Sequence, residues 1–155
     1  EEVMALNVNI IEGTPPAEKG DSYVAWDDYE VSSTSLWTDG IGSCVAIALY
    51  VPELKIGSLA HISGVRCPSI IPETMYPENI VDTLASRLSK YKMEASLAGE
   101  DGKNDISKIV KRSLQAWNIP LVGEDLGSFG GTRGREVHFD CQKGEVTIYR
   151  LPPLF

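Results

Sequence analysis

The feature that most constrains the fold is an uninterrupted apolar run over residues 45–51, bounded by Gly42 and Pro52. A short apolar run between a glycine and a proline favours a buried β-strand over a helix. Residues 53–57 then predict a turn, and a second apolar run over 58–62 predicts a partner strand. The sequence therefore predicts a β-hairpin whose first strand is buried.

The predicted hairpin brings a histidine close to a cysteine. Because antiparallel partners reverse direction, His61 in the second strand returns toward Cys44, at the start of the first. A thiolate can attack a carbonyl carbon, an imidazole can take and return the proton, and a hydroxyl can orient the imidazole. Thr38 precedes Cys44 and carries such a hydroxyl, and the backbone of the Gly42-Ser43 turn offers donors for an oxyanion. These are the parts of a thiol-dependent acyl-transfer site.

Each of these residue types also has an ordinary structural interpretation. Free cysteine is often a buried apolar residue, and a threonine before a glycine-rich turn often caps the local backbone. A lone histidine is more often a hydrogen-bonded structural residue. For Cys67 and Cys141 the structural interpretation is favoured, and His138 is expected on the strand face opposite Val137 and Phe139. A salt bridge that anchors a loop is the expected role of Arg135.

The rest of the chain alternates short strands with two helices. Alternating or β-branched stretches predict further strands at residues 6–10, 23–31, 121–126, 137–141 and 146–148. Helical spacing of apolar residues predicts helices over 80–91 and 106–117, the second capped by Asp105. Irregular or polar segments are expected at residues 13–21, 32–40, 67–77, 98–104 and 127–134. The expected fold class is α/β or α+β, in a single domain over 1–155.

Charge and cysteine usage exclude several classes of function. The net charge of -8 and the pI near 4.7 argue against binding of nucleic acid or anionic lipid. The longest apolar run is too short to span a bilayer, so no membrane insertion is expected. Three widely spaced cysteines give no disulfide framework, which favours a cytoplasmic location. They also form no close ligand pairs with the histidines, and no Lys-Ser/Thr pair follows the late glycines, so we expect neither metal nor cofactor.

Several motifs, in order and at matching spacing, resemble those of one family. They are residues 42–46 (Gly-Ser-Cys-Val-Ala), 60–62 (Ala-His-Ile), 123–127, 134–139 and 144–146. Together they resemble the CheD family of chemoreceptor glutamine deamidases, over about residues 34–150. The resemblance implies layered β-sheets flanked by two main helices, similar to the catalytic domain of cytotoxic necrotizing factor toxins.

The resemblance also implies an activity. It implies a hydrolase that converts glutamine side chains in the cytoplasmic domains of chemoreceptors to glutamate and releases ammonia. Carried over by position, Cys44 is the nucleophile, His61 the general base and acid, and Thr38 the residue that orients the imidazole, with Gly42 and Ser43 in the oxyanion turn.

Two alternatives remain open at this point. Members of the family also bind a CheY-phosphate phosphatase, CheC, so the chain could be a binding module with little turnover. Two departures from the family pattern favour this alternative: residues 98–100 (Ala-Gly-Glu) replace a "GGA" element, and the loop 128–132 is longer. A different thiol hydrolase on the same scaffold is the other alternative, because a fold does not determine its substrate.

Overall fold

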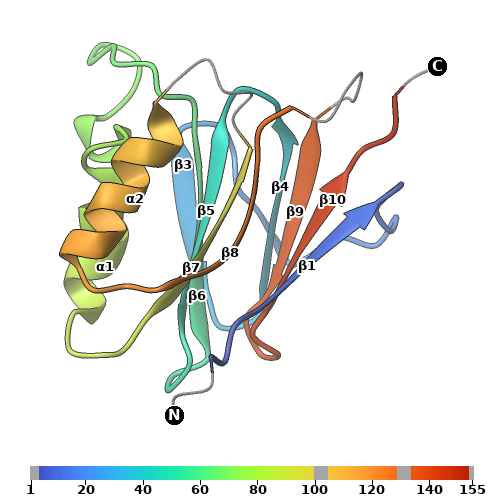
Figure 1. The fold of residues 1–155 in the computed structure, drawn as a ribbon, viewed down its shortest axis with the longest axis horizontal. Helices are drawn as coiled ribbons and strands as arrows, with labels where there is room; N and C mark the ends of the chain where they lie inside the picture. Colours follow the sequence, from blue (N-terminus) through green and yellow to red (C-terminus); the bar gives the residue numbers. More distant parts are fainter. Residues whose placement is uncertain (1–3, 100–104, 129–133, 154–155) are drawn as a thin grey trace.

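The computed structural model describes residues 4–99, 105–128 and 134–153, which form two five-stranded sheets and two α-helices (Figure 1). The strands are β1 (Asn7–Glu12), β2 (Ser22–Tyr23), β3 (Asp28–Ser32), β4 (Ser35–Ile41), β5 (Val45–Val51), β6 (Ile56–Ile62), β7 (Glu94–Gly99), β8 (Leu121–Leu126), β9 (Arg135–Asp140) and β10 (Glu145–Arg150). The helices are α1 (Ile80–Ala85) and α2 (Ile106–Ala116), with 3-10 turns η1 (Glu73–Met75) and η2 (Ser86–Leu88). The mixed class and the excess of strands agree with the expectation from sequence.

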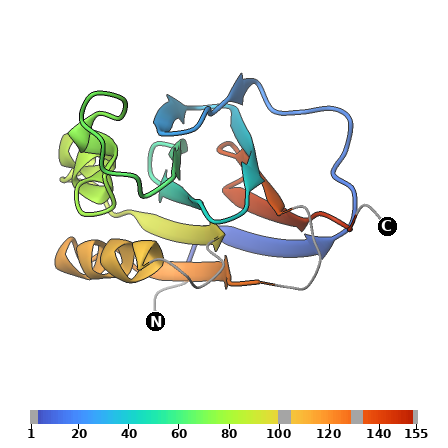
Figure 2. The same cartoon turned by 90° about the horizontal axis from the view of Figure 1, so that it is seen from above.

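The molecule has three layers. Sheet A has the strand order β1-β10-β9-β4-β2, and sheet B the order β3-β6-β5-β7-β8. Sheet B lies between sheet A on one side and both helices on the other (Figures 1 and 2). This is a layered α+β arrangement of the kind that the resemblance implies, whereas the similarity to the toxin domain stays a prediction.

Strand β5 is buried on both faces, which explains its uninterrupted apolar sequence. Its odd-numbered residues belong to the core beneath the helices, and Ala46, Ala48 and Tyr50 belong to the core between the two sheets. A strand that is covered on both faces has no solvent-exposed positions, so its sequence does not alternate between apolar and polar residues. The predicted hairpin with β6 is confirmed, and Ala46 is paired with His61.

The predicted strand over residues 23–31 is wrong as a single element. The chain forms β2 in sheet A and β3 in sheet B, with a turn at Asp27 between them. Asp27 has a φ of 52°, in the left-handed region that breaks a strand and that aspartate tolerates better than most residues. The aromatic and β-branched residues of this segment indicated a strand, but they did not indicate that the chain passes from sheet A to sheet B within it.

The sequence did not predict two of the strands, β4 and β7. The polar segment 32–40 contains most of β4, and β7 runs through Ala98 and Gly99 into the segment expected to be a loop. The first helix is shorter than predicted, because α1 ends at Ala85 and continues as a 3-10 turn to Leu88. Residues 100–104 and 129–133, which include most of the expected glycine loop, lie outside the described residues.

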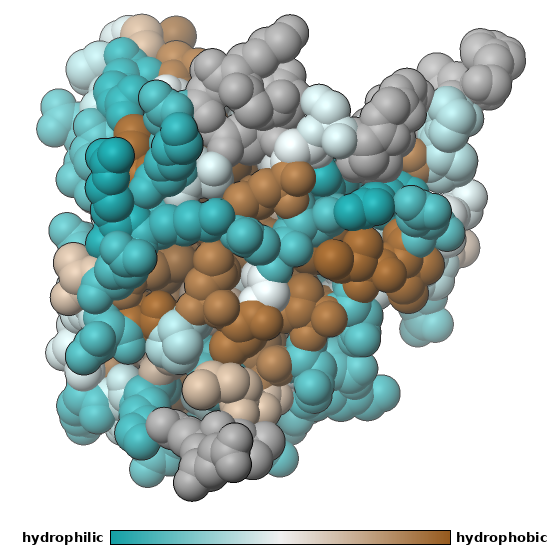
Figure 3. Space-filling model, viewed as in Figure 1, coloured by the Kyte–Doolittle hydropathy of each residue, from teal (hydrophilic) through white to brown (hydrophobic). Residues whose placement is uncertain are grey.

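The apolar surface in Figure 3 gathers where β8 and β1, the edge strands of the two sheets, meet. Ile10 and Ile11 of β1 are each nearly half exposed. Among the described residues, no helix combines the length and the apolar character that crossing a membrane requires.

Candidate active site

Cys44 lies in the turn that carries the chain from sheet A to sheet B, between β4 and β5. This turn is at the upper end of both sheets in Figure 1. The cysteine is 7% exposed, whereas Gly42 and Ser43 are open to solvent. The amide of Gly42 already donates to the carbonyl of Gly40 at 3.1 Å. The thiol therefore has limited access to solvent beside an exposed backbone turn.

Two glycines permit the close packing of this turn. A Cβ at Gly99, the last residue of β7, would lie 2.1 Å from the carbonyl oxygen of Cys44, and Gly99 has a φ of +121°. A Cβ at Gly134 would lie 2.8 Å from the carbonyl oxygen of Ile41. No side chain fits at Gly99 without moving the cysteine backbone.

His61 meets Thr38 across the space between the sheets. His61 is in β6 of sheet B, on the same strand face as Leu59, and is fully buried. Thr38 is in β4 of sheet A and is also fully buried. The Thr38 Oγ1 and His61 Nδ1 atoms are 2.9 Å apart. Ala46, the strand partner of His61, is two residues after Cys44, so the turn that carries Cys44 enters sheet B at the end of the sheet where His61 lies.

The hydroxyl of Thr38 determines the tautomer of His61. It donates its only proton to the carbonyl of Val24, at 2.8 Å, since a carbonyl can only accept. It must therefore accept from Nδ1–H of His61, which leaves the lone pair of the neutral ring on Nε2. Nε2 is buried and has no hydrogen-bond partner among the residues described. The histidine thus holds a free basic nitrogen inside the protein.

Burial keeps both candidate groups uncharged at rest. Desolvation lowers the pKa of His61 to about 4, although the carboxylates of Asp27 and Asp39 oppose this shift. Desolvation, reinforced by the charge of Asp27, raises the pKa of Cys44. At neutral pH both groups are therefore uncharged at rest, as a thiol and a neutral imidazole, and not a thiolate and an imidazolium.

An exposed tryptophan borders the histidine. The ring centroids of Trp26 and His61 are 6.0 Å apart, and Trp26 is 64% exposed. A Cβ at Gly40 would lie 3.6 Å from the indole nitrogen of Trp26, so the indole also reaches the start of the nucleophile turn. Sequence reasoning assigned no role to this residue.

A buried ion-pair network supports the same end of the sheets. Arg135 donates to Asp125 at 2.8 Å and to the carbonyl of Gly127 at 2.7 Å, which confirms its expected role as a loop anchor. Burial raises the pKa of Asp125, but hydrogen bonds from Arg150 and Arg135 outweigh it and hold this pKa below its ordinary value. Gly127 in turn donates to the carbonyl of Gly99.

The remaining cysteines and the second histidine lie apart from this site. Cys141 is fully buried between the sheets, and burial raises its pKa to about 11. Cys67 lies in the loop after β6, near Ser69. His138 lies on the strand face opposite Val137, as predicted, and contacts Glu136 at 2.5 Å. None of them approaches His61 in the contacts that the structure shows.

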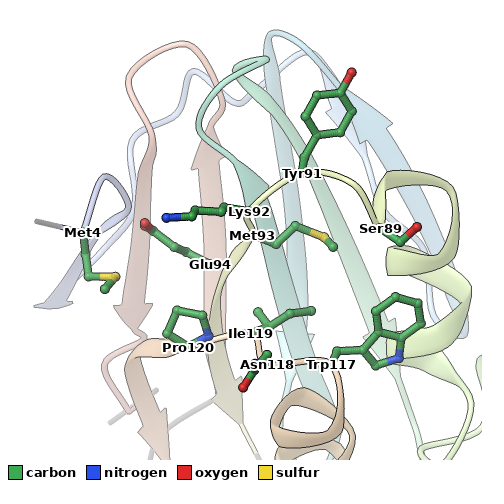
Figure 4. Close-up of a pocket in the computed structure, with 10 residues that line it drawn as sticks. All are labelled: Met4, Ser89, Tyr91, Lys92, Met93, Glu94, Trp117, Asn118, Ile119 and Pro120. Carbon is green, nitrogen blue, oxygen red and sulfur yellow. The ribbon is translucent and has the colours of Figure 1, made fainter. Parts of the chain in front are cut away.

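The pocket in Figure 4 is at the other end of sheet B. It surrounds Glu94 at the start of β7, which pairs with Tyr50 at the far end of β5, whereas Val45 beside the candidate site pairs with Gly99. Its lining contains none of the predicted site residues. In the part of the chain that the structure describes, no group of three His, Cys, Asp or Glu side chains could hold a metal ion.

Comparison with known proteins yields curated relatives over most of the chain. A probable chemoreceptor glutamine deamidase CheD of Clostridium kluyveri is 34% identical, and the match covers 73% of this chain and 81% of that protein. The chemoreceptor glutamine deamidase CheD of Bacillus licheniformis is 33% identical, over 72% of this chain and 77% of the relative. A probable CheD of Desulforamulus reducens is 32% identical, over 78% and 85%. No protein-family model matches the chain.

Proposed function

The chain belongs to the CheD family of chemoreceptor glutamine deamidases, and from this premise we propose that it hydrolyses the side-chain amide of glutamine in the cytoplasmic domains of chemoreceptors. The products are glutamate and ammonia. The observation that carries the proposal is the unpartnered Nε2 of His61, held in the basic tautomer by Thr38 at the same end of the sheets as Cys44.

In the proposed reaction His61 acts first as a general base. Its Nε2 takes the proton of the Cys44 thiol as the sulfur attacks the amide carbon, and the carbonyl becomes an oxyanion. The protonated imidazole then gives this proton to the amide nitrogen, ammonia leaves, and a thioester remains. The uncharged resting pair supports proton transfer during attack over a preformed thiolate. General acid–base catalysis of this kind contributes roughly 10²–10⁴ in rate.

The exposed turn supplies donors for the oxyanion. Because the Gly42 amide donates to Gly40, the amides of Ser43 and Cys44 are the better candidates. One such donor contributes roughly 10²–10³ in rate. Water then attacks the thioester with Nε2 of His61 as the base, which releases glutamate and restores the thiol. Each step uses only groups of this chain and water.

Exposed apolar side chains around the site fit a protein substrate. Trp26 borders His61, and the half-exposed Val65 follows Ser63, whose hydroxyl accepts from the Val65 amide. Large exposed apolar groups beside a reactive centre are typical of surfaces that bind other proteins. A receptor segment that presents a glutamine would contact the exposed indole of Trp26, which borders His61.

Ammonia release from a receptor cytoplasmic fragment tests the proposal. The Cys44→Ala variant should lose activity by roughly 10⁴-fold or more, because the nucleophile is absent. The matched control is Cys67→Ala, which removes a cysteine from a loop and should leave the rate unchanged. Mass spectrometry of the fragment should locate the glutamine converted to glutamate. Full activity in Cys44→Ala would overturn the assignment.

A binding role is the second candidate, and the same exposed Trp26 favours it. A CheC-type phosphatase would then dock beside the turn. Binding of that phosphatase to the wild type and to Cys44→Ala, compared with ammonia release by each, separates the roles. Equal binding without any deamidation by the wild type would favour the binding module.

A further inference from the structure

The turn between β2 and β3 contacts Thr38 and His61, the two residues that assist Cys44 in the proposed function. At one end of the turn, the carbonyl of Val24 accepts the Thr38 hydroxyl, and the Val24 amide donates to Trp37 next to it. At the other end, the amide of Asp27 donates to the carbonyl of His61 at 2.6 Å. One short segment therefore spans from sheet A to sheet B directly over the Thr38–His61 pair.

The carboxylate of Asp27 strengthens this connection. It accepts hydrogen bonds from the amide and the hydroxyl of Ser63, each at 2.9 Å. Asp27 thus holds the backbone of β6 at His61 and again two residues later. Asp27 holds these contacts on a backbone with a left-handed φ of 52°. Such a conformation costs about 1–3 kcal/mol for most residues and persists where the surroundings enforce it.

Asp27 also carries a charge that acts on the site. Two carboxylates influence His61: Asp27 from the β2–β3 turn and Asp39 from β4. Asp39 accepts a hydrogen bond from the Tyr23 hydroxyl at 2.8 Å. Asp27 is the only one of the two that also influences the pKa of Cys44. Its charge raises the pKa of both groups, so it opposes early loss of the thiol proton and favours a protonated imidazole.

We propose that Asp27 is a positioning residue for the deamidation reaction, which fixes the backbone of His61 through a hydrogen bond from its own amide and contributes a negative charge that stabilises the imidazolium formed during attack. The inference rests on the proposed function, because an imidazolium forms only if His61 accepts the thiol proton. The charge stabilises the protonated ring, which exists in the transition state and not at rest. Preorganised charge of this kind lowers the barrier without binding the substrate more tightly.

The Asp27→Asn variant tests the inference with little change of shape. Asparagine tolerates the left-handed conformation and retains an acceptor for Ser63, but it removes the charge. We expect kcat to fall roughly tenfold, a part of the general acid–base contribution, with KM unchanged. The acidic limb of the pH–rate profile should move to lower pH, because loss of the charge lowers the pKa of His61. The matched control is Asp28→Asn, the exposed neighbour whose carboxylate accepts a hydrogen bond from the Tyr29 amide, and neither quantity should change.

A titration of the imidazole by NMR gives a readout that does not need turnover. The chain has two histidines, so the His61 signals can be assigned by comparison with His138→Gln. A lower pKa for His61 in Asp27→Asn supports the inference. An unmoved titration, or a loss of kcat without movement of the acidic limb, would overturn it and leave Asp27 as a structural residue. Failure of the proposed function is seen separately, as a wild type that releases no ammonia.

Discussion

At the scale of single residues, the candidate site depends on which group accepts the hydroxyl proton of Thr38. Thr38 gives its hydroxyl proton to Val24, so it can only accept from His61, and the basic nitrogen of the ring is left on Nε2. An imidazole of the other tautomer would present N–H at that position and could not take the proton of a thiol. In the proposed reaction Thr38 therefore acts through His61, by fixing the tautomer of its ring.

Removal of this hydroxyl gives the first prediction at this scale. Thr38→Val preserves the shape of the side chain but leaves Nδ1–H of His61 without an acceptor. We expect a fall in kcat of roughly ten- to a hundredfold, part of the general acid–base contribution, and a loss of about 1–3 kcal/mol in the free energy of unfolding. Thr38→Ser restores the hydroxyl and should recover most of the rate. Ammonia-release kinetics and urea unfolding check both quantities, and equal rates for the two variants would contradict the assignment.

The sequence predicted some residues of the site for physical reasons and others only through resemblance. The β5–β6 hairpin, and the return of His61 toward the start of β5, followed from two apolar runs and a turn, and the pairing of Ala46 with His61 confirms them. The local capping role considered for Thr38 is wrong, because its hydroxyl bonds distant residues. No local pattern could reveal the contacts of Asp27. Its partners His61 and Ser63 are distant in sequence and approach it only where the chain passes from sheet A to sheet B.

At the scale of elements, the strands that sequence reasoning missed are those whose burial is decided by their neighbours. The sequence of β7, Glu-Ala-Ser-Leu-Ala-Gly, has few β-branched or aromatic residues, yet the strand is buried throughout between β5 and β8. Its small side chains permit close packing that propensity alone does not register. The polar β4 likewise alternates buried Leu36 and Thr38 with more exposed positions, and its polar half concealed the pattern.

The contact between β7 and the nucleophile turn gives a prediction at this scale. In Gly99→Ala the new methyl group would meet the Cys44 carbonyl at 2.1 Å, on a backbone with positive φ. We expect a loss of about 3 kcal/mol or more in the free energy of unfolding, and reduced deamidation because the cysteine backbone must shift. Gly127→Ala is the matched control: Gly127 has a positive φ of 95°, but among the described residues no atom lies within 4 Å of the new methyl group. If both variants lose the same stability, conformational strain and not the contact is responsible.

At the scale of the whole molecule, the site joins the layers. Thr38 comes from sheet A, His61 from sheet B, and Cys44 from the connection between them. The buried imidazole therefore affects the stability of the entire fold. Its pKa is about 4 in the folded protein and near 6.5 when the chain is unfolded, so the unfolded state binds more protons between these pH values. The prediction of one domain over 1–155 stays a prediction.

The sign of this difference gives a prediction of pH-dependent stability. Protonation favours the unfolded chain, so stability should fall as the pH drops from 6.5 to 4, by about 3 kcal/mol from this residue. His61→Gln cannot titrate and lacks this contribution, whereas carboxylates such as Asp125 contribute to both proteins. Urea unfolding across this range should therefore show the stability of the wild type falling more steeply than that of the variant. Parallel curves would contradict the depressed pKa.

The strand order of sheet A also has a consequence for biosynthesis. Thr38 lies in β4, which pairs with the short β2 on one side and with β9 on the other. Within the β4–β9 pair, Thr38 is opposite Val137. A ribosome completes residues 45–62, with the cysteine turn and the histidine strand, long before it reaches β9. The nascent chain therefore already contains Thr38, Cys44 and His61 before β9, the main partner strand of β4, has been made. We therefore expect the contact between Thr38 and His61 to form stably only once β9 is in place, late in synthesis.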